Sequence, residues 1–174
     1  MFYKFKKSIS LIYALFLVVL LVFLDQLTKY LAVHHLMNNS DVVLIPGALQ
    51  LHYLENTGAA FSLLQGRQLL FAVITPILLL FLVYSVIRMP QEKKYSLLNY
   101  IVVIVIAGAI GNYIDRILNN YVVDFIYFSL INFPVFNVAD IYVTCGVIVL
   151  FFLVLFYYKD EDFEEIKHSL LFKK

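Results

Sequence analysis

Four long apolar runs constrain this chain more than any other feature of its sequence. They lie at about 9–24, 69–87, 97–114 and 139–158. A helix of roughly 20 apolar residues spans the hydrocarbon core of a membrane. With 63% hydrophobic and only 14% charged residues, the chain has too few polar groups to cover a water-exposed surface. We therefore expect an all-α membrane protein with four transmembrane helices, forming a single integral-membrane domain over residues 1–174.

The first apolar run follows three lysines and so has the outline of a secretory signal peptide. Asp25 and Gln26 follow the run, at the place where a signal-peptide cleavage site would need small residues. We therefore expect the run to be retained as a membrane anchor.

Basic residues predict how the four spans are oriented. Ten of the thirteen lie on one side of the predicted membrane: Lys4, Lys6, Lys7, Arg88, Lys93, Lys94, Lys159, Lys167, Lys173 and Lys174. The other side has only Lys29, Arg67 and Arg116. Positive residues are enriched in cytoplasmic loops, so we expect both termini in the cytoplasm and the loops 25–68 and 115–138 facing outward.

The first outward loop carries a strand pattern. The apolar run at 42–45 leads to a Pro46-Gly47 turn, after which apolar and polar residues alternate from Leu49 to Tyr53. This pattern is typical of a hairpin, so we expect a small β-rich cradle at the outer membrane surface. The acidic stretch at 159–167 is expected to be a solvated cytoplasmic tail.

Composition excludes several classes of function. A net charge of +1 argues against a nucleic-acid binder. The single cysteine, Cys145, rules out a disulfide within the chain and a thiolate metal cluster, and we expect it to be a small buried side chain. The four histidines form no metal-protease motif, and no serine nucleophile motif or phosphate-binding loop is present. We expect no metal and no organic cofactor.

Charged and polar side chains near the ends of a membrane span are energetically costly, so each is expected to have a partner or a function. Asp25 and Lys29 are four residues apart, so an ion pair on one helix would account for both. Asp115 ends the third span, where its charge opposes the helix dipole, so it should have a partner in Arg116 or across the bundle. Small residues around Gly108 allow a second helix to approach closely there. A polar clamp between helices and a role near substrate or lipid headgroup are both open.

Two aspartates are candidates for catalysis. Asp124 lies in an apolar run, where burial should raise its pKa. Asp140 opens the fourth span on the same predicted side of the membrane. Two carboxylates within about 3 Å of each other share one proton, which allows one to activate water and the other to donate a hydrogen bond to a carbonyl. This pair would suit peptide-bond hydrolysis at the membrane surface.

Two other classes of function are compatible with these residues. A small transporter also carries carboxylates in its spans, although its binding site is usually near the bilayer midplane. Spans two and four have no acidic residue at their centres. A scaffold protein would tolerate the loss of either aspartate.

Five segments, taken together, resemble the bacterial lipoprotein signal peptidases, also called signal peptidase II. They are Asp25-Gln26-Leu27-Thr28-Lys29, Asn56-Thr57-Gly58-Ala59-Ala60-Phe61, the run from Ala107 to Arg116, Val123-Asp124-Phe125, and Phe136-Asn137-Val138-Ala139-Asp140. They occur in the family's order, and the length and four spans also match. Ala107 stands where many members have glycine, and alanine still permits close packing.

The resemblance implies an intramembrane aspartic endopeptidase that cuts diacylglyceryl-modified prolipoproteins just before the lipidated cysteine. It assigns Asp124 and Asp140 as the catalytic pair. It also implies a set of residues that bind substrate or brace the site: Asp25, Lys29, Asn56, Gly58, Asn112, Asp115, Arg116 and Asn137. The implied location is the bacterial cytoplasmic membrane, with the site near its outer face, contact with membrane lipids, and a monomer sufficient for activity.

Overall fold

Five α-helices and a three-stranded sheet make up the described part of the chain. A computed structural model describes residues 2–58 and 68–172. Its helices are α1 (Phe2–Leu36), α2 (Gln68–Arg88), α3 (Ser96–Asn119), α4 (Val138–Phe152) and α5 (Asp160–Leu171). Shorter helical turns are η2 (Lys93–Tyr95), η3 (Ser129–Ile131) and η4 (Leu153–Tyr157), and the strands are β1 (Val42–Ile45), β2 (Leu49–Asn56) and β3 (Val122–Tyr127). The expected outward cation Arg67, the motif part Ala59-Ala60-Phe61, and Lys173 and Lys174 lie outside the described residues.

Four of these helices are long and apolar enough to cross a membrane. They cover Lys7–Leu36, Leu70–Arg88, Lys93–Asn119 and Val138–Tyr157. The predicted fold class, a helical membrane protein with a small β-sheet, is confirmed. The helices extend beyond the apolar runs, since α1 continues through Asp25 to Leu36 and α3 continues to Asn119. The expected outward loops therefore begin later than residues 25 and 115, because polar groups inside these helices find partners there.

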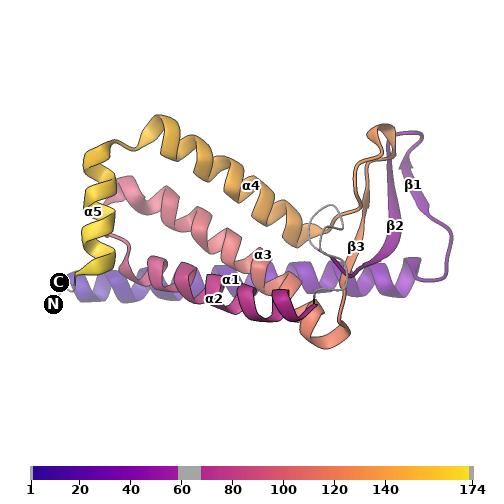
Figure 1. The fold of residues 1–174 in the computed structure, drawn as a ribbon, viewed down its shortest axis with the longest axis horizontal. Coiled ribbons are helices and arrows are strands. Elements are labelled where there is room, and N and C mark those ends of the chain that lie inside the picture. The colour runs from indigo at the N-terminus through magenta and orange to yellow at the C-terminus, as the bar shows by residue number, and fades with distance from the viewer. Residues whose placement is uncertain (1, 59–67, 173–174) are drawn as a thin grey trace.

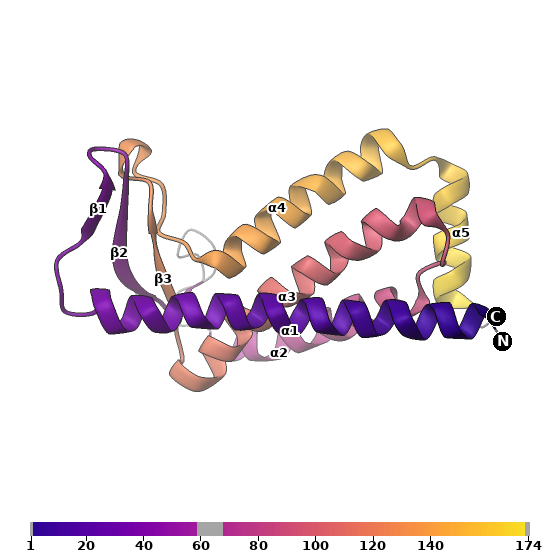
Figure 2. The same ribbon diagram turned by 180° about the vertical axis from the view of Figure 1, so that it is seen from behind.

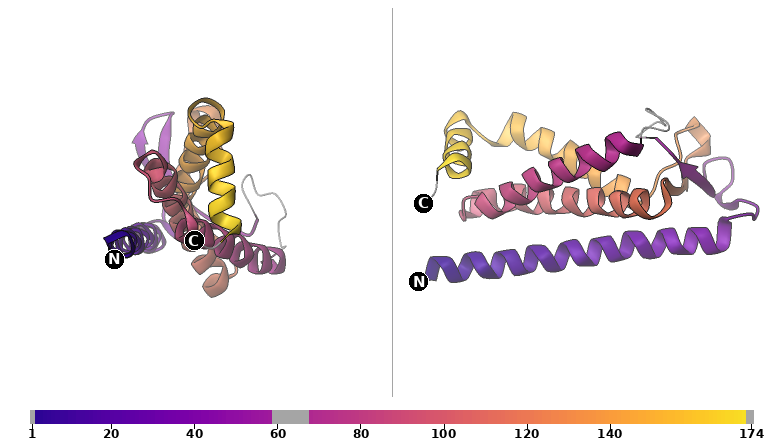
Figure 3. Two further views of the ribbon diagram at one scale, coloured as in Figure 1. Left: turned by 90° about the vertical axis from the view of Figure 1, so that its left-hand side faces the viewer. Right: turned by 60° about the horizontal axis from the view of Figure 1, so that its bottom comes forward.

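The long helices run lengthwise, with the sheet at one end and α5 at the other (Figures 1 and 2). Both termini lie at the α5 end, and an end-on view shows α1 to one side of the other helices (Figure 3). Helix α3 is central because it packs against α1, α2 and α4. The molecule therefore has two distinct ends, one bearing the sheet and one bearing α5.

The sheet has the antiparallel order β1-β2-β3. The predicted hairpin is confirmed, and its turn contains Gly47 with a φ of 71°. Strand β3 adds to the hairpin by pairing Leu54 of β2 with Asp124. Val123 and Phe125 pack with α1. Because neighbouring side chains in a strand point to opposite faces, Asp124 points away from α1.

The expected close approach of α3 and α4 takes place at Gly108. A Cβ atom at this position would lie 2.6 Å from the Ala139 carbonyl oxygen and 2.8 Å from a Val143 methyl. Ala107 and Ala139 are fully buried beside it. Glycine thus allows the first turn of α4, which carries Asp140, to lie directly against α3.

Two expectations differ from the structure. The acidic stretch has no buried residue and so is solvated as expected, but it is a docked helix and not a free tail, because α5 packs against α2 and η2. Its Asp162 accepts hydrogen bonds from Lys94 Nζ at 2.7 Å and the Tyr95 hydroxyl at 3.1 Å, and Arg88 Nε donates to the Ser169 carbonyl at 2.8 Å. Cys145 is exposed on α4 and not buried, as a small apolar side chain on a lipid-facing surface can be.

The α3–α4 contact predicts that Gly108→Ala will destabilise the protein. Overpacking a close contact costs about 1–3 kcal/mol, more than the helix propensity gained from alanine. We expect a lower Tm in detergent. Cys145→Val, which adds bulk on the exposed face of α4, should leave the Tm unchanged, and an equal Tm for both variants would contradict the proposed close contact.

Candidate active site

A buried ion cluster ties α1 to α3 at the sheet end of the helices. Lys29 Nζ lies 2.9 Å from Asp25 Oδ2 and 3.1 Å from Asp115 Oδ2. All three side chains are at most 3% exposed. The predicted Asp25–Lys29 pair is therefore present, and Asp115 finds its partner across the bundle and not in Arg116. One lysine neutralises part of the charge of two carboxylates.

The two carboxylates of this cluster also bind backbone amides of other elements. Asp25 Oδ1 accepts a hydrogen bond from the Ala139 N–H at 2.9 Å, and Asp115 Oδ2 accepts one from the Val123 N–H at 3.1 Å. Ala139 directly precedes Asp140, and Val123 directly precedes Asp124. The cluster therefore fixes the backbone next to each candidate catalytic aspartate.

Gln26 is a fourth member of this cluster, and the sequence did not single it out. Its Nε2 donates to Asp115 Oδ1 at 2.9 Å and to the Gly111 carbonyl at 3.1 Å. A Cβ atom on Gly111 would collide with the Asp25 carboxylate. Gln26 adjoins Asp25 in the sequence, but an amide side chain next to a charged residue does not by itself indicate a site residue.

Asp124 is held by two amide side chains. Its Oδ1 accepts from Asn137 Nδ2 at 2.6 Å, and its Oδ2 accepts from Asn56 Nδ2 at 2.8 Å. The amide of Asn56 is itself oriented, because its Oδ1 accepts from the Gly58 N–H at 2.9 Å. Both carboxylate oxygens of Asp124 thus have fixed positions.

Asp140 is oriented by the N-terminal cap of α4. Asn137 and Asp140 form a reciprocal capping box, in which each side chain accepts from the other residue's backbone N–H. Asp140 Oδ1 also accepts from Asn112 Nδ2 at 2.7 Å. Asn112 Oδ1 accepts in turn from Lys29 Nζ at 2.8 Å and from Asn137 Nδ2 at 3.1 Å. Asn137 and Asn112 therefore link the two aspartates to each other and to the ion cluster.

The surroundings of Asp124 favour its protonated form. Burial is the main cause, and the negative charge of Asp140 adds to it; together they raise the pKa of Asp124 to about 7. The hydrogen bonds from Asn56 and Asn137 stabilise the charged form and oppose this shift. A buried carboxyl beside a second carboxylate is the expected electrostatic setting for a pair that shares one proton.

Arg116 lies beside the aspartates without an ion-pair partner among the described residues. Its Nη2 donates to the Gly58 carbonyl at 3.0 Å, its Nη1 donates to the Asn112 carbonyl at 3.3 Å, and its guanidinium lies 4.7 Å from the centre of the Phe71 ring. Its Nε is buried and has no hydrogen-bond partner within residues 2–58 and 68–172. Phe71, on α2, thus helps to position Arg116. No pattern in the sequence gave a reason to select Phe71.

A cavity of about 490 Å³ opens in front of the two aspartates, between α2, α3 and α4. Asn56, Asn112, Arg116, Asp124 and Asp140 line its polar end. Its apolar part is lined by Phe71, Leu78, Leu82, Val105, Ala109 and Val143. The arrangement can hold an extended or helical apolar segment with one backbone carbonyl near the carboxylates. Within residues 2–58 and 68–172, His, Cys, Asp and Glu side chains form no group of three suited to a metal ion.

The structure brings all ten predicted site residues into one hydrogen-bonded network. Its members are Asp25, Lys29, Asn56, Gly58, Asn112, Asp115, Arg116, Asp124, Asn137 and Asp140. They come from α1, β2, the segment after β2, α3, β3 and the start of α4. Residues distant in sequence thus converge at the junction of the helices and the sheet.

Comparisons with known proteins agree on one family. A family model described as signal peptidase (SPase) II matches residues 17–156. A lipoprotein signal peptidase of Caldanaerobacter subterraneus subsp. tengcongensis is 46% identical over 144 residues, covering 82% of this chain and 96% of that protein. One from Streptococcus pyogenes serotype M5 is 41% identical over 145 residues, covering 83% and 92%. A bacterial membrane enzyme solved at 2.3 Å resolution by the in meso method superposes with a TM-score of 0.75 at 35% identity, covering 82% and 87%.

The matched region spans the ion cluster, the two aspartates and the apolar cavity. It includes every residue of the network described above, from Asp25 to Asp140. The chain therefore belongs to the signal peptidase II family.

Proposed function

We propose that the chain is an intramembrane aspartic endopeptidase that removes the signal peptide from diacylglyceryl-modified prolipoproteins. The bond cut is the one just before the lipidated cysteine. Membership of the signal peptidase II family favours this function over the transporter and scaffold hypotheses. The observation that carries the aspartic mechanism is the joint fixation of Asp124 and Asp140 at the polar end of an apolar cavity.

The proposed chemistry uses one proton shared by the two aspartates. Asp124, whose pKa is raised to about 7, carries this proton and hydrogen-bonds the scissile carbonyl oxygen. Asp140 takes a proton from water, whose oxygen attacks the carbonyl carbon and forms a tetrahedral intermediate. The carbon–nitrogen bond then breaks, and the leaving nitrogen accepts a proton from the pair. The products are a signal peptide with a free carboxylate and a mature protein with a free amino group.

The charge distribution supports an outward-facing site. Arg88 and Lys94 hydrogen-bond to residues of α5, and Lys159 directly precedes that helix. Helix α5 lies at the end of the molecule opposite the sheet (Figure 1). The positive-inside rule then puts the α5 end and both termini in the cytoplasm. This orientation places the aspartates near the outer interface of the bacterial cytoplasmic membrane, where water and the diacylglyceryl group of a substrate are both available. One chain supplies both aspartates, so a monomer suffices.

Removing either aspartate tests the proposed catalytic pair. Asp124→Asn and Asp140→Asn should each lower cleavage of a lipidated prolipoprotein by at least about 10²-fold, because each removes one proton-transfer group. A gel-shift assay with purified protein in detergent measures this. The matched control Asp160→Asn, on the exposed start of α5, should keep normal activity. Near-normal turnover by either active-site variant would refute the proposed pair.

The cleavage rate should depend on pH. Because the pKa of Asp124 is raised to about 7, the shared proton is present below this pH and is lost above it. Cleavage should fall by about tenfold per pH unit on the alkaline side, and on the acidic side it should fall again once the pair of aspartates binds a second proton. The rate of peptide release measured from pH 4 to 9 should be bell-shaped. A rate that stays level above pH 8 would contradict a catalytic shared proton.

Both stability and cleavage should depend on the ion cluster of Lys29 with Asp25 and Asp115. Lys29→Met leaves Asp25 and Asp115 buried without a cation, and breaking a buried pair in this way costs about 3–5 kcal/mol. We expect a large drop in Tm together with loss of cleavage. The triple variant Lys29→Met, Asp25→Asn, Asp115→Asn removes the unpaired charges and should recover part of the Tm. Lys93→Met, at an exposed position, is the matched control, and an equal Tm for Lys29→Met and Lys93→Met would disprove the role of the cluster.

A further inference from the structure

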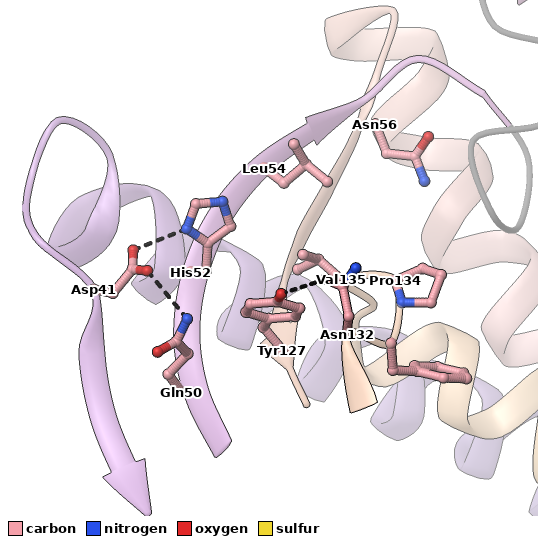
Figure 4. A pocket seen from close by; sticks show the side chains of 10 residues that line it. Asp41, Gln50, His52, Leu54, Asn56, Tyr127, Asn132, Pro134 and Val135 are labelled. Carbon is pink, nitrogen blue, oxygen red and sulfur yellow. Dashed lines mark hydrogen bonds and ion pairs between the residues drawn. The ribbon is translucent and has the colours of Figure 1, made fainter. Parts of the chain in front are cut away.

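A second cavity, of about 550 Å³, lies over the sheet. It is lined by Asp41, Gln50, His52, Leu54, Asn56, Tyr127, Asn132, Phe133, Pro134 and Val135. Figure 4 shows Asp41, Gln50 and His52 grouped at one side, with Tyr127, Asn132, Pro134 and Val135 facing them. The catalytic mechanism proposed above makes no use of the group around Asp41.

This cavity adjoins the cavity in front of the aspartates. The two share Asn56, Phe133, Pro134 and Val135. Asn56 is also the residue that binds Asp124. A polypeptide that passes the aspartates would therefore meet the second cavity at Asn56, from which β2 leads toward Asp41.

The alternation of β2 directs its polar side chains into this cavity. Gln50, His52 and Asn56 line it, whereas Leu51 and Tyr53 pack toward α1 on the other face. The two faces of β2 thus differ: one attaches the sheet to the helices, and the other supplies polar side chains to a cavity whose remaining lining is partly apolar.

Asp41 gives the far end of the cavity a negative charge. Its Oδ1 lies 2.9 Å from His52 Nδ1, and its Oδ2 accepts from Gln50 Nε2 at 3.4 Å. The Asp41 side chain is 38% exposed and that of His52 is 41% exposed, so both remain accessible to a ligand. A carboxylate accepts up to about four hydrogen bonds, which leaves Asp41 with free acceptor capacity. The ten lining residues include no lysine or arginine.

We infer that this cavity binds the first residues of the mature protein that follow the lipidated cysteine, and that Asp41 makes it favour a lysine or arginine there over an aspartate or glutamate. The inference rests on the proposed peptidase function and extends it to substrate selectivity. The apolar cavity between the helices matches the apolar signal peptide. The hydrophilic segment on the other side of the cut bond then lies toward the sheet, where the polar cavity begins.

A substrate series tests this selectivity. Diacylglyceryl-modified peptides carry lysine, serine or aspartate at each of the first four positions after the cysteine, and kcat/KM is measured for each with purified full-length protein in detergent. The wild type should cut the lysine peptide about threefold faster than the aspartate peptide at one or more positions, since a half-exposed charge pair is weak. The difference should shrink as salt is added.

Variants of Asp41 assign the preference to this side chain. Asp41→Asn should bring the lysine-to-aspartate ratio close to one, and Asp41→Lys should invert it. Because each ratio is measured within one variant, it does not depend on how much of that variant is folded. Glu55→Gln is the matched control, since Glu55 is on β2 but does not line the cavity, and it should keep the wild-type ratio.

The outcomes separate this inference from the proposed function. Equal rates for all wild-type peptides, or a lysine preference that persists in Asp41→Asn, would overturn the inference and leave the peptidase function intact. Failure of the wild type to cut any lipidated peptide would overturn both.

Discussion

The contact on which the site depends is the buried pairing of Lys29 with Asp25 and Asp115. Burying three charged groups is costly, and removing the lysine leaves two buried carboxylates without a cation. The cluster fixes the position of two backbone segments, because Asp25 accepts a hydrogen bond from the Ala139 N–H and Asp115 accepts one from the Val123 N–H. Elements from three distant parts of the chain are thereby held in one arrangement. The residues next to these two amides are the two aspartates that we propose as catalytic.

The two cavities have different linings, and this difference matches the two parts of the proposed substrate. The cavity among the helices is mostly apolar and suits a signal peptide, and the cavity over the sheet has a mixed lining with a larger polar share, which suits a mature segment. Asp124 and Asp140 lie where the first cavity becomes polar, and Asn56 belongs to both. The sheet therefore contributes one of the aspartates, the amide that orients it, and a surface on which selectivity can act.

Local spacing in the sequence was enough to predict several of these features. The four-residue spacing of Asp25 and Lys29 predicted their ion pair, and the turn at Pro46-Gly47 predicted the hairpin. Strand β3 was missed because its apolar residues show no clear alternation and its partner, β2, is more than 60 residues earlier. The docking of α5 was missed because an acidic stretch resembles a solvated tail until Lys94 and Tyr95 are seen beside it. Gln26 and Phe71 act through tertiary contacts that no local pattern records.

The most direct test of the central claim is the mass of the products released from a purified prolipoprotein, prepared with and without its diacylglyceryl group. The proposed function predicts that the lipidated form yields two products, an intact signal peptide and a mature protein that begins at the lipidated cysteine. The form without lipid should remain uncut. Cleavage at another bond, or equal cleavage of both forms, would contradict the account.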